Sequence, residues 1–74
     1  MDSQAAKRRL GAVERDISIS AFVIQRQRTV LAILERDGPE RLAAQARSLL
    51  GVLLEAQALR IAERDKLLVI LANE

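Results

Sequence analysis

Residues 49–71, LLGVLLEAQALRIAERDKLLVIL, form the longest aliphatic-rich stretch of this 74-residue chain. At about 100° per residue, the apolar side chains of this stretch gather on one side of a helix. The arc holds Leu50, Leu53, Ile61, Leu68 and Leu71, with Leu42, Ala46, Leu49 and Leu67 at its edge. A lone helix with such a face would aggregate, so the stretch predicts a helix that needs a partner helix.

The first half of the chain supplies a matching helix. From Leu10 onward its apolar positions alternate in steps of three and four, which is the spacing of a heptad seam. The seam consists of Leu10, Val13, Ile17, Ser20, Ile24, Gln27, Leu31 and Leu34. A second apolar strip runs beside it and consists of Ile19, Val23, Val30 and Ile33, with Phe22 further round. The widened face indicates at least two neighbouring helices, which is more than a two-helix hairpin provides.

A glycine and the only proline of the chain separate the two halves. Gly38 is expected to adopt the left-handed conformation that ends a helix, and Pro39 to take the first position of the next helix. Asp37 or Gly38 is then expected to serve as the N-cap. Because so short a connection forces two long helices antiparallel, positions whose numbers sum to about 77 should lie level.

A short side-chain oxygen near the N-terminus can cap the first helix, and Asp2 or Ser3 is expected to do so. We therefore predict a single all-α domain over residues 1–74. The first helix spans roughly residues 3–37, the turn residues 37–39, and the second helix roughly residues 39–73.

A chain of this size buries only about 60% of the surface that it exposes when unfolded. Cysteine and histidine are absent, which excludes disulfides and the commonest zinc ligands. We therefore expect oligomerisation, with the hairpin assembling into a four-helix-bundle homodimer or a higher oligomer. The predicted oligomer interface consists of Leu10, Val13, Ile17, Ile19, Phe22, Val23, Ile24, Val30, Leu31, Leu34, Leu50, Leu53, Ile61, Leu68 and Leu71.

Polar residues interrupt the apolar faces and are predicted to fix the register of the bundle, since a buried polar group must find a partner. They are Ser20, Gln27, Gln57 and Arg64. The level positions pair Ser20 with Gln57 and bring Arg64 to Glu14 or Asp16. The alternative is a polar pocket within the bundle that holds a small anion.

The only basic concentration begins at Lys7, Arg8 and Arg9, within a net charge of +2. These side chains could contact a polyanion, and such binding would weaken steeply with salt. Acidic neighbours dilute the cluster, and the single aromatic residue, Phe22, offers little for base stacking. A solvated face with ion pairs is therefore preferred over nucleic-acid binding.

Catalysis has little support, because neither His nor Cys is present as a base or nucleophile. We expect no enzyme activity, no cofactor and no metal. The run from Ile17 to Leu34 is broken by Gln25, Arg26, Gln27 and Arg28, which argues against a membrane span and favours the cytoplasm. The favoured function is a self-associating scaffold or protein-interaction module. A basic nucleic-acid regulator and peripheral membrane association through Phe22 are the alternatives.

The chain resembles a group of short, uncharacterised helical proteins of rhizobia and related alphaproteobacteria. The resemblance spans residues 14–71 and is carried by Glu14-Arg15, Ile17, RQR at 26–28, LERDG at 34–38, LL at 49–50 and LEAQALRIAERDKLL at 54–68. Members of the group carry His at the positions of Asp16, Val23 and Arg60, and charged residues at those of Ile19 and Phe22. The resemblance implies a first helix that has become more apolar and assembles more tightly or binds a different partner; it implies no activity.

Overall fold

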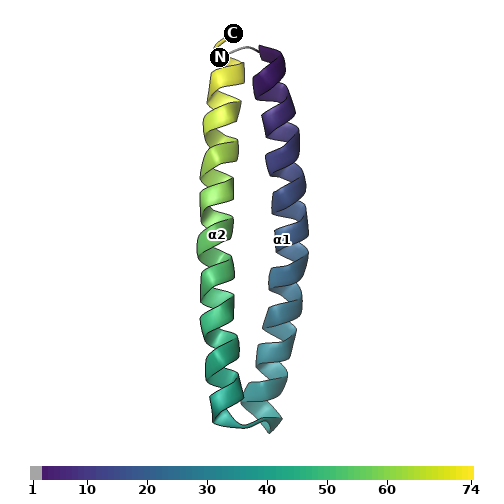
Figure 1. The fold of residues 1–74 in the computed structure, drawn as a ribbon, viewed down its shortest axis with the longest axis vertical. Helices are drawn as coiled ribbons and strands as arrows, with labels where there is room; N and C mark the ends of the chain where they lie inside the picture. The colour runs from purple at the N-terminus through teal and green to yellow at the C-terminus, as the bar shows by residue number, and fades with distance from the viewer. Residues whose placement is uncertain (1–2) are drawn as a thin grey trace.

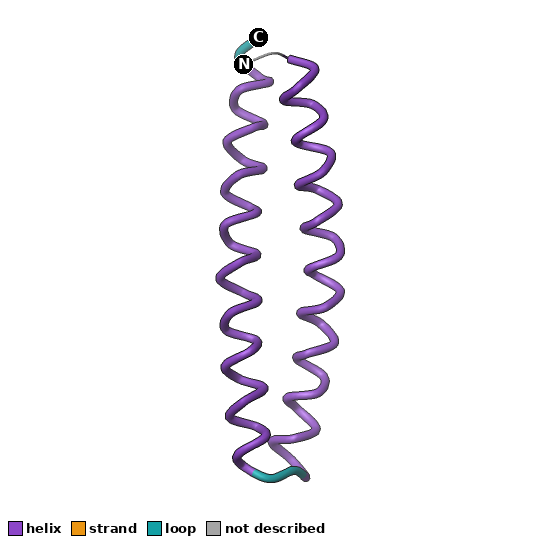
Figure 2. Tube along the Cα trace, in the orientation of Figure 1, coloured by secondary structure: helices purple, strands orange, loops and turns teal. Residues whose placement is uncertain are grey.

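The computed structural model describes residues 3–74 and consists of two long helices side by side (Figure 1). Helix α1 spans Ser3–Asp37 and helix α2 spans Glu40–Ala72. The start of α1 and the end of α2 lie at one end of the rod, and the short turn lies at the other (Figure 2). The Cα atoms extend over 53 × 15 × 14 Å. The predicted all-α antiparallel hairpin is therefore confirmed.

The turn differs from its prediction. No residue among 3–74 has a positive φ, so Gly38 is not left-handed. Its N–H instead donates to the Leu34 carbonyl at 2.9 Å and so continues the hydrogen bonding of α1. Glycine fits here because a Cβ at position 38 would lie 3.0 Å from Leu34 Cα and 3.1 Å from the Leu34 carbonyl oxygen. Gly38 is therefore required for close approach to the last turn of α1.

The cap of α2 is also shifted from its prediction. Pro39, rather than Asp37 or Gly38, occupies the N-cap position with φ −63° and ψ 140°, and no side chain caps the helix. The Pro39 carbonyl accepts from the N–H groups of Leu42 and Ala43, both at 3.1 Å. The extended ψ of Pro39 ends α1 without a left-handed residue. The predicted cap Asp2 lies outside the described residues, and Ser3 is the first helical residue.

The core of the hairpin is a narrow seam between the helices. Toward the open end, Ala6, Val13 and Leu67 form a buried cluster, against which Leu10, Ile17 and Leu71 pack. Toward the turn, the buried apolar residues are Ile24, Ala43, Ala46 and Leu50. The sequence-based prediction placed Leu68 on the apolar arc and Leu67 at its edge. The structure reverses this, because Leu67 is buried and Leu68 is 47% exposed.

Two ion pairs flank the seam, one on each face of the hairpin. Arg9 pairs with Glu63 near the open end, and Arg47 pairs with Glu35 near the turn. Each joins α1 to α2 at nearly the levels that an antiparallel turn at Gly38 imposes. All four side chains are exposed, so the pairs contribute little to stability and chiefly mark how the helices face each other.

Candidate functional site

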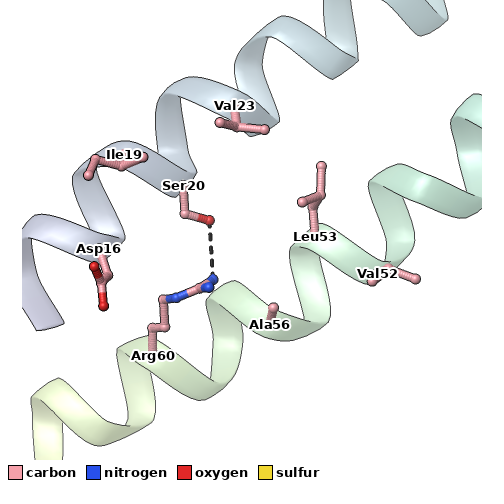
Figure 3. A pocket seen from close by; sticks show the side chains of 8 residues that line it. All are labelled: Asp16, Ile19, Ser20, Val23, Val52, Leu53, Ala56 and Arg60. Atoms are coloured by element: carbon pink, nitrogen blue, oxygen red, sulfur yellow. Dashed lines mark hydrogen bonds between the residues drawn. The ribbon is translucent and has the colours of Figure 1, made fainter.

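A shallow groove of about 250 Å³ lies between the helices on one face of the hairpin (Figure 3). Its lining residues are Asp16, Ile19, Ser20, Val23, Val52, Leu53, Ala56 and Arg60. Asp16 and Arg60 lie at one end, and Val23 and Val52 lie toward the other. The volume of the groove is smaller than the roughly 300–1,000 Å³ of pockets that enclose a small-molecule ligand. Its size and apolar walls suit the side chains of a packed helix.

The groove extends into a longer apolar face because its lining residues recur at heptad spacing. Val30 follows Val23 by seven residues, and Leu49 precedes Ala56 by seven. Residues separated by whole heptads share one side of a supercoiled helix. The resulting surface, called the grooved face below, contains Ile19, Val23, Val30 and Ile33 of α1 and Leu42, Leu49, Val52 and Leu59 of α2. Every one of these eight large apolar side chains is exposed in the single hairpin.

The polar residues of the seam form contacts different from those predicted. Gln57 does not pair with Ser20: its Nε2 donates to the Ile17 carbonyl at 3.0 Å. Ser20, which is buried, accepts instead from the Arg60 guanidinium, with 3.4 Å between Oγ and Nη1. Gln57 and Ser20 therefore each bond to a residue about one helical turn away from the one that lies level with them.

Gln57 also carries an unsatisfied acceptor. Its Oε1 is buried and has no hydrogen-bond partner among the described residues. A buried acceptor without a donor costs about 1–3 kcal/mol. The Gln57 amide is thus a polar position that the hairpin tolerates at some cost in stability, as expected of a residue that specifies register.

Arg64 does not reach across to Glu14 or Asp16. Its guanidinium binds the neighbouring Asp65 carboxylate on the same helix, with 3.0 Å between Nη2 and Oδ1. The predicted cross-helix role of Arg64 is therefore wrong, because a long side chain at the edge of the seam meets a local carboxylate first. Gln27, the remaining predicted register residue, is half-buried.

The predicted interface residues divide into three groups by burial. Val13, Ile24 and Leu50 are already buried between α1 and α2. Leu10, Ile17, Leu31, Leu34, Leu53, Ile61 and Leu71 are half-buried in the same seam. Ile19, Phe22, Val23, Val30 and Leu68 are exposed. Only the exposed group leaves a large apolar surface for a second molecule, and Phe22 and Leu68 lie off the grooved face.

Five of the eight residues of the grooved face were missing from the predicted interface. They are Ile33 on α1 and Leu42, Leu49, Val52 and Leu59 on α2, and all five are exposed. The signal that could have found those on α2 is their heptad relationship, since Leu49 follows Leu42 by seven residues and Leu59 follows Val52 by seven.

The basic cluster at the open end is partly neutralised. Lys7, Arg8 and Arg9 are exposed, but Arg9 donates to the Glu63 carboxylate of α2. This hydrogen bond and the Arg9 charge lower the pKa of Glu63 below its ordinary value of 4.5 and raise the pKa of Arg9. A similar contact near the turn raises the pKa of Arg47, through hydrogen bonds to Glu40 and Glu35. The cluster therefore presents fewer free cations than its sequence indicates.

Metal chemistry has no visible site in the part of the chain that the structure describes. Residues 3–74 contain no group of three or more His, Cys, Asp or Glu side chains that could hold a metal ion. Helix α1 is long and apolar enough to cross a membrane by length and composition alone. The core helix of a soluble protein passes the same test when it is mostly buried, whereas the qualifying stretch of α1 is largely unburied in the single hairpin.

Comparison of the chain with protein-family models, with curated proteins and with solved structures found no match. The resemblance to short rhizobial helical proteins therefore stays a prediction.

Proposed function

We propose that this protein is a self-associating helical scaffold or protein-interaction module without catalytic activity. The observation that supports it is the grooved face, where eight large apolar residues are exposed. Among residues 3–74, the core of the hairpin holds seven buried apolar residues, and three of them are alanines. One copy thus exposes more large apolar side chains on one face than it buries in its seam.

This distribution of apolar side chains limits the stability of a single copy. Full burial of a Val, Leu or Ile side chain contributes about 1.5–3 kcal/mol, whereas the alanines of the seam contribute much less. A 74-residue hairpin with so thin a core has little stability of its own. Covering the grooved face therefore stabilises the folded chain and removes a surface prone to unspecific aggregation.

Sedimentation velocity at micromolar concentration tests the proposal with a matched pair of variants. Val52 lies on the grooved face and Val69 lies outside it, and the two valines are 62% and 60% exposed. We expect the unmodified chain to sediment as a dimer or larger assembly. Val52→Asp should weaken association at least tenfold, while Val69→Asp should leave it unchanged. A dissociation constant above about 100 μM would describe only a weak complex. A chain that is still a well-folded monomer at that concentration would therefore contradict the proposal.

Association with a membrane surface is the second candidate, supported by the hydropathy of α1 and by Phe22, which is 65% exposed. An interfacial helix presents one apolar side to lipid and a polar side to water. Arg26 and Arg28 lie in the middle of the apolar run of α1, which weakens this candidate. Flotation of the purified chain with anionic liposomes would support it and would contradict the cytoplasmic scaffold.

A further inference from the structure

We propose that a second copy of this chain covers the grooved face in parallel orientation, with both turns at the same end. In this arrangement Asp16 of each copy pairs with Arg60 of the other. The inference rests on the proposed self-association and specifies its surface, partner and orientation.

The apolar residues of the two helices match in level along the rod. Ile19 and Ile33 bound the strip on α1, and Leu42 and Leu59 bound the strip on α2. Because the helices are antiparallel, Ile19 lies level with the Leu59 end and Ile33 with the Leu42 end. A two-fold axis along the rod places α1 of one copy over α2 of the other. Every apolar side chain of the grooved face then meets an apolar neighbour.

The opposite orientation also superposes the strips but brings like charges together. An axis across the rod would place α1 over α1 and would pass level with Arg26, which is midway between Ile19 and Ile33. Arg26 of one copy would then face Arg26 of the other. Like charges across an interface cost free energy and select against the wrong partner or orientation.

The parallel orientation brings opposite charges together at the end of the groove. Asp16 and Arg60 lie at nearly the same level on opposite helices, and both line the groove (Figure 3). Placing α1 of one copy over α2 of the other therefore sets Asp16 against Arg60 twice in each dimer. Arg26 then lies level with Val52, an uncharged residue of the grooved face.

The contacts of Arg60 provide a second argument. The half-buried guanidinium has five N–H donors, and its one partner among residues 3–74 is the Ser20 hydroxyl. A second copy lying over the groove would exclude water from Arg60. A buried cation needs a carboxylate and hydrogen bonds to remain charged. Asp16 is exposed and engages no basic side chain within the described hairpin at ion-pair distance, so it can supply them to the other copy.

A second copy aligned along the whole rod would cover a projection of 53 Å by 15 Å, close to the roughly 800 Å² that one partner contributes to a standard interface. The apolar strip from Ile19 to Ile33 forms about 21 Å of that length, at about 1.5 Å per residue.

The orientation is tested by distance measurement between spin labels, which is simple because the chain has no native cysteine. Arg41→Cys places a label near the turn, and Asn73→Cys places one at the open end. In the parallel dimer both label pairs should lie within roughly 30 Å, since neighbouring helices in a bundle are about 10 Å apart. In the antiparallel dimer, whose axis passes level with Arg26, the Asn73 labels would lie roughly 65 Å apart along the rod and the Arg41 labels roughly 30 Å apart, at about 1.5 Å per residue, so the Asn73 pair decides the orientation. That result would overturn the orientation while leaving self-association intact.

The charge pair is tested by mixing two variants that each dimerise poorly. Asp16→Arg and Arg60→Glu should each weaken the homodimer roughly tenfold, because each sets like charges against each other. When mixed, the two variants restore opposite charges at both positions and should form heterodimers in excess of the statistical half in native mass spectrometry. Glu55→Arg, an exposed charge reversal outside the groove, is the control and should leave the homodimer unchanged.

The outcomes separate the two proposals. A monomeric unmodified chain refutes self-association and this inference with it. A dimer with short label distances but statistical mixing shows that Asp16 and Arg60 do not pair between copies, and overturns the pairing. Short distances together with preferred heterodimers support the full arrangement.

Discussion

The side chain of Gln57 on α2 donates from Nε2 to the backbone carbonyl of Ile17 on α1 at 3.0 Å. The bond joins residues 40 positions apart across the middle of the hairpin. The other end of the same amide, Oε1, is buried without a partner in the described residues. One side chain therefore both links the two helices and carries an unsatisfied acceptor, and the two effects can be separated by substitution.

Gln57→Leu should raise the free energy of unfolding by up to about 1 kcal/mol, because it removes the unsatisfied acceptor and adds apolar packing. Gln57→Ala should lower it by about 1–2 kcal/mol, because it leaves a gap in the seam and deletes the bond to Ile17. Urea denaturation compares the two. If Gln57 specifies register, the leucine variant should also show a broader set of oligomers in native mass spectrometry. A leucine variant less stable than the alanine variant would contradict this account.

Two glycines should respond oppositely to replacement by alanine. Gly51 lies inside α2, and a Cβ there meets no atom within 4 Å. Gly51→Ala should therefore stabilise the hairpin by about 0.5–1 kcal/mol, the helix-propensity difference. At position 38, a Cβ would lie 3.0 Å from Leu34 Cα and 2.7 Å from Leu34 Cδ2. Gly38→Ala should destabilise by about 1 kcal/mol or more through overpacking.

Thermal unfolding followed by circular dichroism measures both glycine variants against the unmodified chain. The Gly51 variant also tests whether another helix backbone approaches there in an oligomer. Gly51→Ala should leave the assembly state unchanged, because Gly51 lies outside the groove. A loss of association on this substitution would place the interface on the other face of the hairpin.

The fold was largely predictable because helical periodicity and the Gly38-Pro39 turn are local signals. The observed helices, Ser3–Asp37 and Glu40–Ala72, begin and end within about one residue of the predicted bounds. The prediction was wrong about which side of α2 packs against α1. Counting at 100° per residue favoured Leu68, whereas the contact seam follows a heptad pattern of 3.5 residues per turn and therefore includes Leu67.

The candidate site was harder to predict for the same reason. The true seam of α2 passes through Gln57, Arg60 and Arg64, which are polar, so a search for apolar residues moved away from it. That shift hid the grooved face, because Leu42 and Leu49 were placed only at the edge of the apolar arc and Val52 and Leu59 were not placed on it. The partners of Ser20 and Arg64 depend on side-chain reach within one helical turn, which residue spacing alone does not specify.

The contact between Arg9 and Glu63 predicts how stability depends on pH. The Arg9 hydrogen bond lowers the pKa of Glu63 in the folded chain below the ordinary 4.5. A depressed carboxyl pKa adds stability that is present above the unfolded value and is lost as pH falls through the folded value. The difference in melting temperature between the unmodified chain and Glu63→Gln should therefore be positive at pH 7. It should disappear at pH values well below 4.5.

Carbon-13 NMR titration of the Glu63 carboxyl group measures the same effect directly. Arg9→Gln should raise the Glu63 midpoint toward its ordinary value, because it removes the charge and the strongest donor. Since both side chains are exposed, added salt should reduce the shift. A Glu63 midpoint that does not respond to Arg9→Gln would show that the ion pair is not formed in solution.

The neighbours Phe22 and Val23 distinguish the grooved face from the rest of α1. Both were predicted to lie in an oligomer interface, but Val23 lines the groove, and Phe22, 65% exposed, does not. If a second copy covers the grooved face, Val23→Ser should raise the dimer dissociation constant about tenfold, as expected for a loss of roughly 1.4 kcal/mol. Phe22→Ser should change it less than about twofold, because the side chain stays in solvent. Sedimentation equilibrium across a dilution series measures both constants. If Phe22→Ser is the more damaging variant, the dimer interface lies on the outer side of α1 instead. If the same variant also abolishes flotation with liposomes, that outer side binds lipid.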